Sequence, residues 1–267
     1  MQKICKYNPK SLYSYINERR IVRDNIGPLK TRDGTLITTD NDMVNTMNNY
    51  FSSVFTIEQL NNVSELGQYE GNILDTFNFS TEEVQEKLQH LNIYKSTGPD
   101  VLHPRILRAL EDKLARPLTH IYNNSVETRN IPEDWKSANV TAIHKKGSRQ
   151  ESGNYRPISL TSVVCKKMER LVKMILIIHL EMNKLIGDSQ HGFRNKRSCL
   201  TSLLDFSAQV IDTYDTDNNK AVDLVYLDFQ QAFDKVPHER LMVKVNAHGI
   251  QGDIARWIRN WLAGRCQ

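Results

Sequence analysis

The segment Ala221–Pro237, AVDLVYLDFQQAFDKVP, constrains the fold and function of this chain more than any other stretch. Its first seven residues are nearly continuously apolar, which is typical of a strand covered on both faces of a sheet. The run ends at Asp228, and the residues after it read as the start of a helix. A carboxylate at that position could hold Mg²⁺, because this ion prefers oxygen ligands and often takes one or two protein carboxylates besides phosphate and water. The pattern alone also fits an acid that only ends the strand or caps the helix.

Three motifs occur in a fixed order along the chain. YRPISL at Tyr155–Leu160 precedes QHGFRNKRS at Gln190–Ser198, which precedes DFQQAFDKVPH at Asp228–His238. Together they closely resemble the reverse transcriptases of LINE-type non-LTR retrotransposons, nearest to the jockey-like group. KSTGPDVLHPRIL at Lys95–Leu107 and IPEDWKSANVTAIHKKG at Ile131–Gly147 match the fingers region of the same family. The resemblance extends weakly to the N-terminus and so covers nearly the whole chain.

The resemblance implies a helix-rich α+β fold, a fragment of a right-hand polymerase. We expect an N-terminal spacer at residues 1–75, fingers at 76–220 and the start of the palm at 221–267. In the family, the segment after WIRNWLAGRCQ continues into a PQGS-type loop, an Asp-Asp hairpin and a thumb, and none of these occurs in the 267 residues. The resemblance therefore implies an RNA-directed DNA polymerase whose present fragment we expect to be inactive alone.

For the catalytic centre, the resemblance implies that Asp228 is the first metal carboxylate of the palm. The backbone carbonyl of Phe229 is a further ligand, and the complete enzyme holds two Mg²⁺ ions. Gln231 and Ala232 match positions whose backbone N–H groups meet the triphosphate near a helix start, where anions are favoured, although their side chains could equally be spacers. Phe233 matches the aromatic steric gate that excludes a 2′-hydroxyl; the alternative is a core phenylalanine at a helix start.

For the fingers, Arg156 resembles the residue that clamps the incoming triphosphate, which a guanidinium does bidentately. The alternative is a contact between Arg156 and a template phosphate. Lys145 and Lys146 resemble the neighbouring fingers lysine, and the sequence does not decide which of them faces the nucleotide. Phe193 could stack on a base or ribose, or be buried and anchor its loop. The residues that match the template-contacting block are Gln190, Gly192, Phe193, Arg194 and Arg197.

The charge of the chain is concentrated in its middle. The net charge is only +4, but thirteen Lys/Arg stand against four Asp/Glu between Lys136 and Arg197. This basic band suits a polyanion; the alternative is a solvated basic face. We expect an RNA template, a DNA primer or target and dNTPs as partners, and the sequence does not indicate the oligomeric state.

Other features argue against a membrane or secreted protein. The longest apolar run, Leu171–Leu180, contains Lys173 and His179 and is too short to span a bilayer. No secretion signal is visible, and the four cysteines are far apart without metal-ligand spacing. We therefore expect reduced thiols, no membrane, and a nuclear and cytoplasmic location.

Apolar spacing and breakers predict the secondary structure. On the strand expected before Asp228, Asp223 would point to the opposite face, so we exclude it from the site. A capping box is expected at Ser80-x-x-Glu83, a kink or an interruption of the following helical stripe at Pro117, and a linker at residues 58–73. Strands are expected at Trp135–Ile143 and Tyr155–Leu160. Helices are expected at Ser11–Arg20, Asp42–Phe55, Val164–Ile178, Leu200–Tyr214, Val236–Gly249 and Ile254–Trp261.

Two alternative functions stay open. The first is a non-catalytic nucleic-acid-binding remnant, as a pseudogene or domesticated product, which keeps the basic fingers and has lost the chemistry. The second is a maturase-like cellular reverse transcriptase. YRPISL followed by QHGFRNKRS favours the LINE type.

Overall fold

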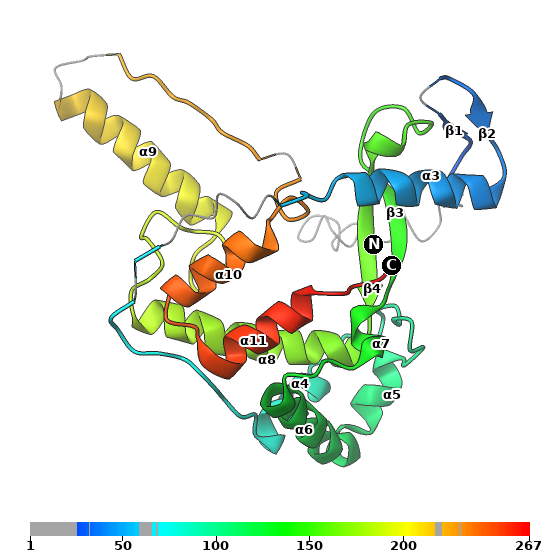
Figure 1. Ribbon diagram of the computed structural model, residues 1–267. Helices are drawn as coiled ribbons and strands as arrows, with labels where there is room; N and C mark the ends of the chain where they lie inside the picture. The colour runs from blue at the N-terminus through cyan, green and yellow to red at the C-terminus, as the bar shows by residue number, and fades with distance from the viewer. Residues whose placement is uncertain (1–25, 32, 59–65, 68, 217–220, 230) are drawn as a thin grey trace, which may run out of the picture. The chain divides into compact units, whose positions relative to one another are not determined.

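The computed structural model describes residues 26–31, 33–58, 66–67, 69–216, 221–229 and 231–267 (Figure 1). The helix expected at Ser11–Arg20 lies outside the described residues. The described chain is helix-rich with two small sheets, consistent with an α+β fragment. Its helices are α3 Asp40–Ser53, α4 Thr81–Gln89, α5 Pro104–Ala109, α6 Glu111–Thr128, α7 Glu133–Lys136, α8 Val163–Met182, α9 Cys199–Thr216, α10 His238–Ala247 and α11 Gly252–Leu262. Its strands are β1 Leu29–Lys30, β2 Leu36–Ile37, β3 Ala138–His144 and β4 Tyr155–Thr161, with a 3₁₀ turn at Ser152–Asn154.

The chain divides into two compact units. Unit 1 comprises Met1–Ser53 and Ala142–Pro157, and unit 2 comprises Val54–Thr141 and Ile158–Gln267. The boundaries fall inside β3 and β4, which form one two-stranded sheet. This division is geometric. The expected polymerase parts, with boundaries after residues 75 and 220, stay a prediction.

Unit 1 contains the β1–β2 hairpin, α3 and the connection between β3 and β4. The hairpin is antiparallel, with Leu29 opposite Ile37, and its turn uses Gly34 at φ +90°. The helix expected at Asp42–Phe55 is confirmed as α3, which buries Met47 and Phe51. The backbone N–H of Lys145 donates to the carbonyl of Asn154 at 2.8 Å and closes the loop between the two strands.

Unit 2 has a core of buried apolar residues from α4, α6, α8 and α11. Tyr122 lies at its centre; its ring makes edge contacts with Phe79 at 6.1 Å and Trp135 at 5.7 Å between centroids. Its buried hydroxyl donates to the carbonyl of Val164 in α8 at 2.8 Å, so the phenol is both packed and hydrogen-bonded. Burial raises the pKa of Tyr122. The aromatic contacts continue from Trp135 to Trp261 of α11 at 6.4 Å.

Several local predictions are confirmed. The Ser80 hydroxyl accepts the N–H of Glu83 at 3.2 Å, and the Glu83 carboxylate accepts the N–H of Ser80 at 2.9 Å, which forms the capping box of α4. Strand β4 agrees with the strand expected at Tyr155–Leu160, and α8, α9, α10 and α11 agree with the four helices expected after it. Gly249 follows α10 at φ +75°, the conformation that favours glycine beyond a helix end.

The interruption considered at Pro117 and the start of the first strand were predicted wrongly, whereas the alternative of a kink at Pro117 stays a prediction. The helical stripe is interrupted at Leu110, between α5 and α6, whereas Pro117 lies inside α6. Burial of Leu118 and Tyr122 beyond the proline compensates for the backbone hydrogen bond that proline cannot donate. Strand β3 begins at Ala138, and Trp135 belongs to the short helix α7. There Glu133 and Asp134 occupy the first turn, where acids are favoured, and the indole of Trp135 is buried in the core.

The strand predicted before Asp228 is also wrong, as is the helix predicted directly after it. Residues 221–229 have no regular secondary structure, and apolar side chains such as Leu227, 86% exposed, face solvent. A strand needs a hydrogen-bonded neighbour, and neither sheet of the described chain includes this segment. Residues 231–235 form a turn, and α10 begins only at His238, because Pro237 at its N-cap sets the start.

Lys167 of α8 lies against this core. Its side chain is only 3% exposed, and the nearby residues Cys165 and Met168 of the same helix are buried in the core. The pKa of Lys167 is lowered from 10.5 to about 8. Burial is the largest cause, and the positive charges of Arg170, Lys87 and Lys95 add to it. The charged form of Lys167 therefore opposes folding at neutral pH. None of the described helices has the length and apolar character required to cross a membrane.

Replacing Lys167 by methionine should therefore stabilise unit 2. We expect Lys167→Met to raise the free energy of unfolding at pH 7 by about 1 to 3 kcal/mol, since one pKa unit corresponds to about 1.4 kcal/mol. Lys167 keeps its proton up to about pH 10.5 in the unfolded chain but releases it near pH 8 in the folded chain. The unfavourable contribution of Lys167 to stability is therefore largest below pH 8 and decreases as the pH rises from 8 to 10.5. Urea unfolding at pH 7 and pH 10 measures both effects.

Lys113→Met is the matched control, because Lys113 is exposed and paired with the exposed Asp112 at 3.0 Å. The control should change stability little at either pH. A Lys167→Met protein no more stable than the control at pH 7 would contradict the account of the buried cation.

Candidate nucleotide and template site

The predicted site residues of unit 2 lie on two connections, one between α8 and α9 and one between α9 and α10. The first carries Gln190–Arg197, and the second carries residues 221–237. The second connection leads from the far end of α9 back to α10 (Figure 1). The ring of Tyr226 on this connection lies 6.0 Å from the ring of Phe206 in α9. The two connections are thus tied to the same helix.

Phe193 and Phe233 join the two connections directly. Their ring centroids are 6.2 Å apart at an interplanar angle of 90°, an edge-to-face contact. The ammonium of Lys173, in α8, lies 5.6 Å from the centroid of the Phe193 ring. Phe193 is 70% exposed and Phe233 is 80% exposed, so neither has the environment expected of a core phenylalanine. The template block and the expected steric gate therefore lie side by side, which the sequence motifs did not predict.

Asp228 lies on the exposed part of the second connection, between Tyr226 and Phe233. Phe229 beside it is exposed too. The described residues contain no group of three or more His, Cys, Asp or Glu that could hold a metal ion. Asp223 is also exposed, and because the segment is not a strand, the alternation of faces does not exclude it.

Backbone conformations in the left-handed region mark both connections. Phe193, Lys196 and Gln231 have φ of 61°, 59° and 53°. Such angles cost a residue other than glycine about 1 to 3 kcal/mol and concentrate at functional sites. Gln231 is held in a turn in which its carbonyl accepts the N–H groups of Asp234 at 3.0 Å and Lys235 at 3.1 Å. Ala232 is exposed in the same turn.

Within the template block, some polar side chains bind the protein itself. The Arg194 guanidinium donates to the carbonyl of Gly187 at 3.1 Å, and its Nε lies 3.9 Å from the Glu181 carboxylate. The Gln190 amide donates to the carbonyl of Gly192 at 3.1 Å. Arg194 is thus placed to fix the loop.

Lys196 and Arg197 of the same block are exposed. His191 is buried, with Nδ1 3.0 Å from the Thr201 hydroxyl, and it anchors the block to α9. Lys196 and Arg197 are therefore the cations of the block that are available to a polyanion.

Thr56 and Glu58, in the part of the chain expected to be a spacer and linker, form hydrogen bonds with the end of the second connection and the start of α10. The Glu58 carboxylate accepts the backbone N–H groups of Glu239 at 2.9 Å and Arg240 at 3.0 Å, at the first turn of α10. The Thr56 hydroxyl donates to the carbonyl of Lys235 at 3.0 Å. The negative charge of such a carboxylate is also stabilised by the positive end of the helix dipole, which lies at the helix start. No local sequence pattern predicts these contacts, because the partners lie more than 170 residues apart.

Lys145, Lys146 and Arg156 belong to unit 1. Lys145 and Lys146 lie on the connection between β3 and β4, and Arg156 is the second residue of β4. All three side chains are exposed. Within the described parts of the chain, none of these three side chains forms a hydrogen bond or an ion pair. They are available to an anionic ligand of unit 1.

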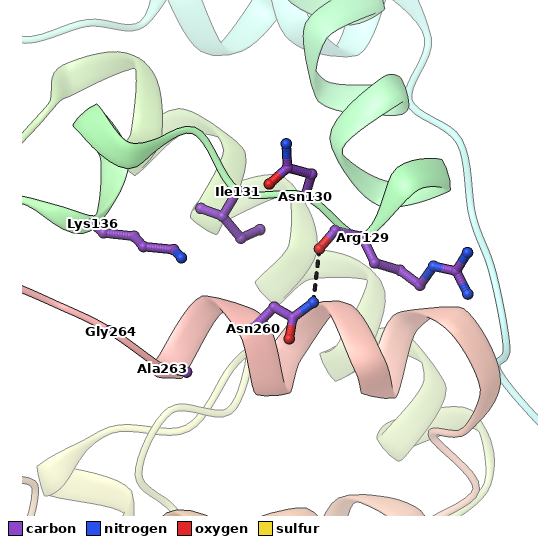
Figure 2. A pocket seen from close by; sticks show the side chains of 7 residues that line it. All are labelled: Arg129, Asn130, Ile131, Lys136, Asn260, Ala263 and Gly264. Carbon is purple, nitrogen blue, oxygen red and sulfur yellow. Dashed lines mark hydrogen bonds between the residues drawn. The ribbon is translucent and has the colours of Figure 1, made fainter.

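A hollow of about 170 Å³ lies in unit 2 between the end of α6 and the end of α11. Figure 2 shows the amide of Asn260 donating to the backbone carbonyl of Arg129, at 2.9 Å, while the Arg129 guanidinium points away. That guanidinium lies 3.2 Å from the carboxylate of Asp253, and Lys136 pairs with Glu133. The hollow contains none of the predicted site residues, and the side chains of Arg129, Lys136 and Asn260 are paired within the protein.

The predicted resemblance is confirmed by comparison with known proteins. Residues 143–267 match the family described as reverse transcriptase (RNA-dependent DNA polymerase). The chain is 29% identical over 226 residues to the probable RNA-directed DNA polymerase from transposon BS of Drosophila melanogaster, covering 82% of this chain and 25% of that protein. It is 33% identical over 167 residues to the RNA-directed DNA polymerase from mobile element jockey of the same fly, covering 61% of this chain and 18% of that protein. The chain thus spans a quarter or less of the length of these relatives.

The contacts of Glu58 predict a specific local loss. Glu58→Ala should leave the N–H groups of Glu239 and Arg240 without their acceptor, and loss of a helix cap typically costs about 1 kcal/mol. We therefore expect these two amides to exchange with deuterium faster, by about fivefold, at unchanged rates in the core around Tyr122. Glu70→Ala, at an exposed glutamate, is the control. Unchanged exchange at Glu239 and Arg240 would show that Glu58 does not hold the second connection.

Proposed function

We propose that this chain carries the fingers and the start of the palm of an RNA-directed DNA polymerase of a non-LTR retrotransposon. The proposed parts are a spacer at residues 1–75, fingers at 76–220 and palm from 221. The proposal is supported by the family match of residues 143–267. The observation that carries it is the Phe193–Phe233 contact, which puts the template block beside the segment of Asp228. The substrates are dNTPs, an RNA template and a DNA primer.

In this proposal, Asp228 and the backbone carbonyl of Phe229 hold Mg²⁺ against the triphosphate. An exposed carboxylate with one carbonyl fits the preference of this ion for few protein oxygens, completed by substrate phosphate and water. Two Mg²⁺ ions about 4 Å apart would activate the primer 3′-hydroxyl and neutralise the leaving pyrophosphate. The other acids of such a centre come from the Asp-Asp hairpin of the family. Asp228 positions the α-phosphate and does not itself take a proton.

Phe233 sets the choice of sugar in the same proposal. Its exposed ring would lie under the incoming deoxyribose and leave no space for a 2′-hydroxyl. The edge contact with Phe193 holds the ring of Phe233 in place, and the cation of Lys173 over the Phe193 ring adds a positive charge beside the nucleic acid.

Arg156 would clamp the triphosphate bidentately, with Lys145 or Lys146 beside it as a point charge. Within unit 2, the backbone N–H groups of Gln231 and Ala232 would meet phosphate oxygens from the strained turn. Lys196 and Arg197 would contact the template backbone.

Removal of the Asp228 carboxylate should separate chemistry from binding. In a full-length polymerase that contains this segment, we expect Asp228→Ala to lower Mg²⁺-dependent primer extension by at least about 10³-fold, because the metal loses its ligand. RNA binding measured by anisotropy should change less than about twofold, since Asp228 does not touch the template. Asp223→Ala tests the other exposed carboxylate of this segment and should keep extension, because Asp223 lies outside the motif DFQQAFDKVPH, which begins at Asp228. Extension by Asp228→Ala within tenfold of the unsubstituted enzyme would remove Asp228 from the site.

The steric-gate role of Phe233 has its own test. Phe233→Val in the same enzyme should raise ribonucleotide incorporation relative to deoxynucleotide incorporation by about 10- to 100-fold, since removing a steric block of this size is worth about 1 to 3 kcal/mol. The measurement compares kcat/KM for UTP and dTTP on one template. Phe55→Val, at another exposed phenylalanine of unit 2, should leave the ratio unchanged. An equal ratio in Phe233→Val and Phe55→Val would leave Phe233 without a role in sugar selection.

A further inference from the structure

The first turn of α10 receives its cap from a distant part of the chain. Its N-cap is Pro237, whose side chain has no atom that accepts a hydrogen bond, so the first N–H groups need other acceptors. The Glu58 carboxylate accepts the N–H of Glu239 at 2.9 Å and the N–H of Arg240 at 3.0 Å. The Glu58 side chain is only 13% exposed. The cap of α10 therefore comes from the segment that precedes α4.

Thr56 holds the residues just before this helix. Its hydroxyl donates to the carbonyl of Lys235 at 3.0 Å, while the N–H of Lys235 donates to the carbonyl of Gln231 at 3.1 Å. Lys235 thus joins Thr56 to the turn that begins at Gln231, whose backbone is left-handed at φ 53°. Phe233 lies inside that turn. The backbone of Phe233 is therefore tied to Thr56 through two hydrogen bonds.

The far end of α10 contacts the same part of the chain. Leu74 forms a parallel bridge with Ile250. The N–H of Leu74 donates to the carbonyl of Gly249 at 2.8 Å, and its carbonyl accepts the N–H of Gln251 at 2.9 Å. Tyr69 lies so close to Gly249 that a side-chain carbon on this glycine would come within 2.5 Å of the ring. The segment before α4 thus contacts both ends of α10.

Helix α10 is also fixed to α11, against which it packs. The guanidinium of Arg259 donates to both carboxylate oxygens of Glu239, at 2.7 and 2.6 Å. Met242 of α10 is buried, and Ile254 and Trp257 of α11 belong to the core. Because the helix is fixed, the contacts of the preceding segment determine how residues 231–237 enter it.

We propose that Thr56 and Glu58 are positioning residues of the polymerase site, although they lie outside residues 143–267, which match the polymerase family. They touch neither substrate nor metal. They hold Lys235 and the start of α10, and so keep Phe233 where its ring excludes a 2′-hydroxyl. The inference rests on the proposed function for the role of Phe233, whereas the support of the turn rests on the hydrogen bonds alone.

Hydrogen exchange of the 267-residue chain tests the support of the turn without any catalysis. Thr56→Val removes the hydroxyl and keeps the shape of the side chain, so the amides of Asp234 and Lys235 should exchange about fivefold faster. Thr213→Val is the matched control, because the Thr213 hydroxyl donates to a carbonyl of its own helix at 2.8 Å. It should leave both amides unchanged. Unchanged exchange of these amides in Thr56→Val would overturn the inference.

Sugar selection in a full-length polymerase that contains this chain tests the positioning role. Glu58→Ala should raise the ratio of kcat/KM for UTP to kcat/KM for dTTP by about fivefold, the factor that corresponds to one lost helix cap. A general loss of stability would lower the use of both nucleotides and leave their ratio unchanged. Glu58→Gln keeps one oxygen acceptor and should recover part of the effect. Glu127→Ala, at an exposed glutamate of α6, should show none, and an unchanged ratio in Glu58→Ala would contradict the proposal.

The double variant Glu58→Ala/Phe233→Val shows whether Glu58 acts through Phe233. Once the ring is removed, Glu58→Ala should change the ratio no further, since substitutions that act on one group are not additive. A further fivefold rise in the double variant would place the action of Glu58 elsewhere and refute its positioning of Phe233. Failure of the proposed function is a separate result. If Phe233→Val alone leaves the ratio unchanged, the steric gate fails, while faster exchange at Asp234 and Lys235 in Thr56→Val still supports the hold on the turn.

Discussion

The arrangement of unit 2 depends on the burial of one group of aromatic side chains. Tyr122 is enclosed between α4, α6 and α8, and its hydroxyl is satisfied by the carbonyl of Val164. Trp135 and Trp261 extend this packing to α11. Each such ring buries about 150 to 250 Å² and gains further from edge contacts. This core fixes α8, whose C-terminal end leads into the first connection of the candidate site, and α11, which packs against α10.

The candidate site itself lies outside that core, on two connections with little regular structure. It is held by a few specific contacts: Phe193 on Phe233, His191 on α9, and Glu58 at the start of α10. Strained φ angles at Phe193 and Gln231 occur in the same connections. Loops that bind ligands commonly have this arrangement, because a rigid core positions their residues while the loop itself stays exposed.

The sequence predicted those parts of the fold that depend on local patterns. The capping box of α4 needs only Ser80 and Glu83, and α8 and α11 follow from apolar spacing. The failures have non-local causes. The apolar run before Asp228 has the composition of a buried strand, but a strand also requires a hydrogen-bonded neighbour, which composition does not specify.

The same distinction holds for the candidate site. The motifs identified Asp228, Phe233 and Phe193 singly, since each residue type has its own chemistry at its motif position. The contact between the two rings and the support from Glu58 depend on tertiary structure. Lys167 carried no local signal, because a lysine in an amphipathic helix ordinarily lies on the exposed face; only the packing of α8 shows that it is enclosed.

Cleavage of the protein backbone by a bound metal tests whether the segment of Asp228 and the ring of Phe193 flank one metal–nucleotide centre, as we propose. Fe²⁺ replaces Mg²⁺ in a full-length polymerase with primer, template and dNTP, and peroxide then generates hydroxyl radicals beside the ion. The account predicts cleavage at two places, within residues 225–233 and near Phe193, and loss of both in Asp228→Ala. Cleavage confined to other parts of the chain, such as the hollow between Arg129 and Asn260, would contradict it.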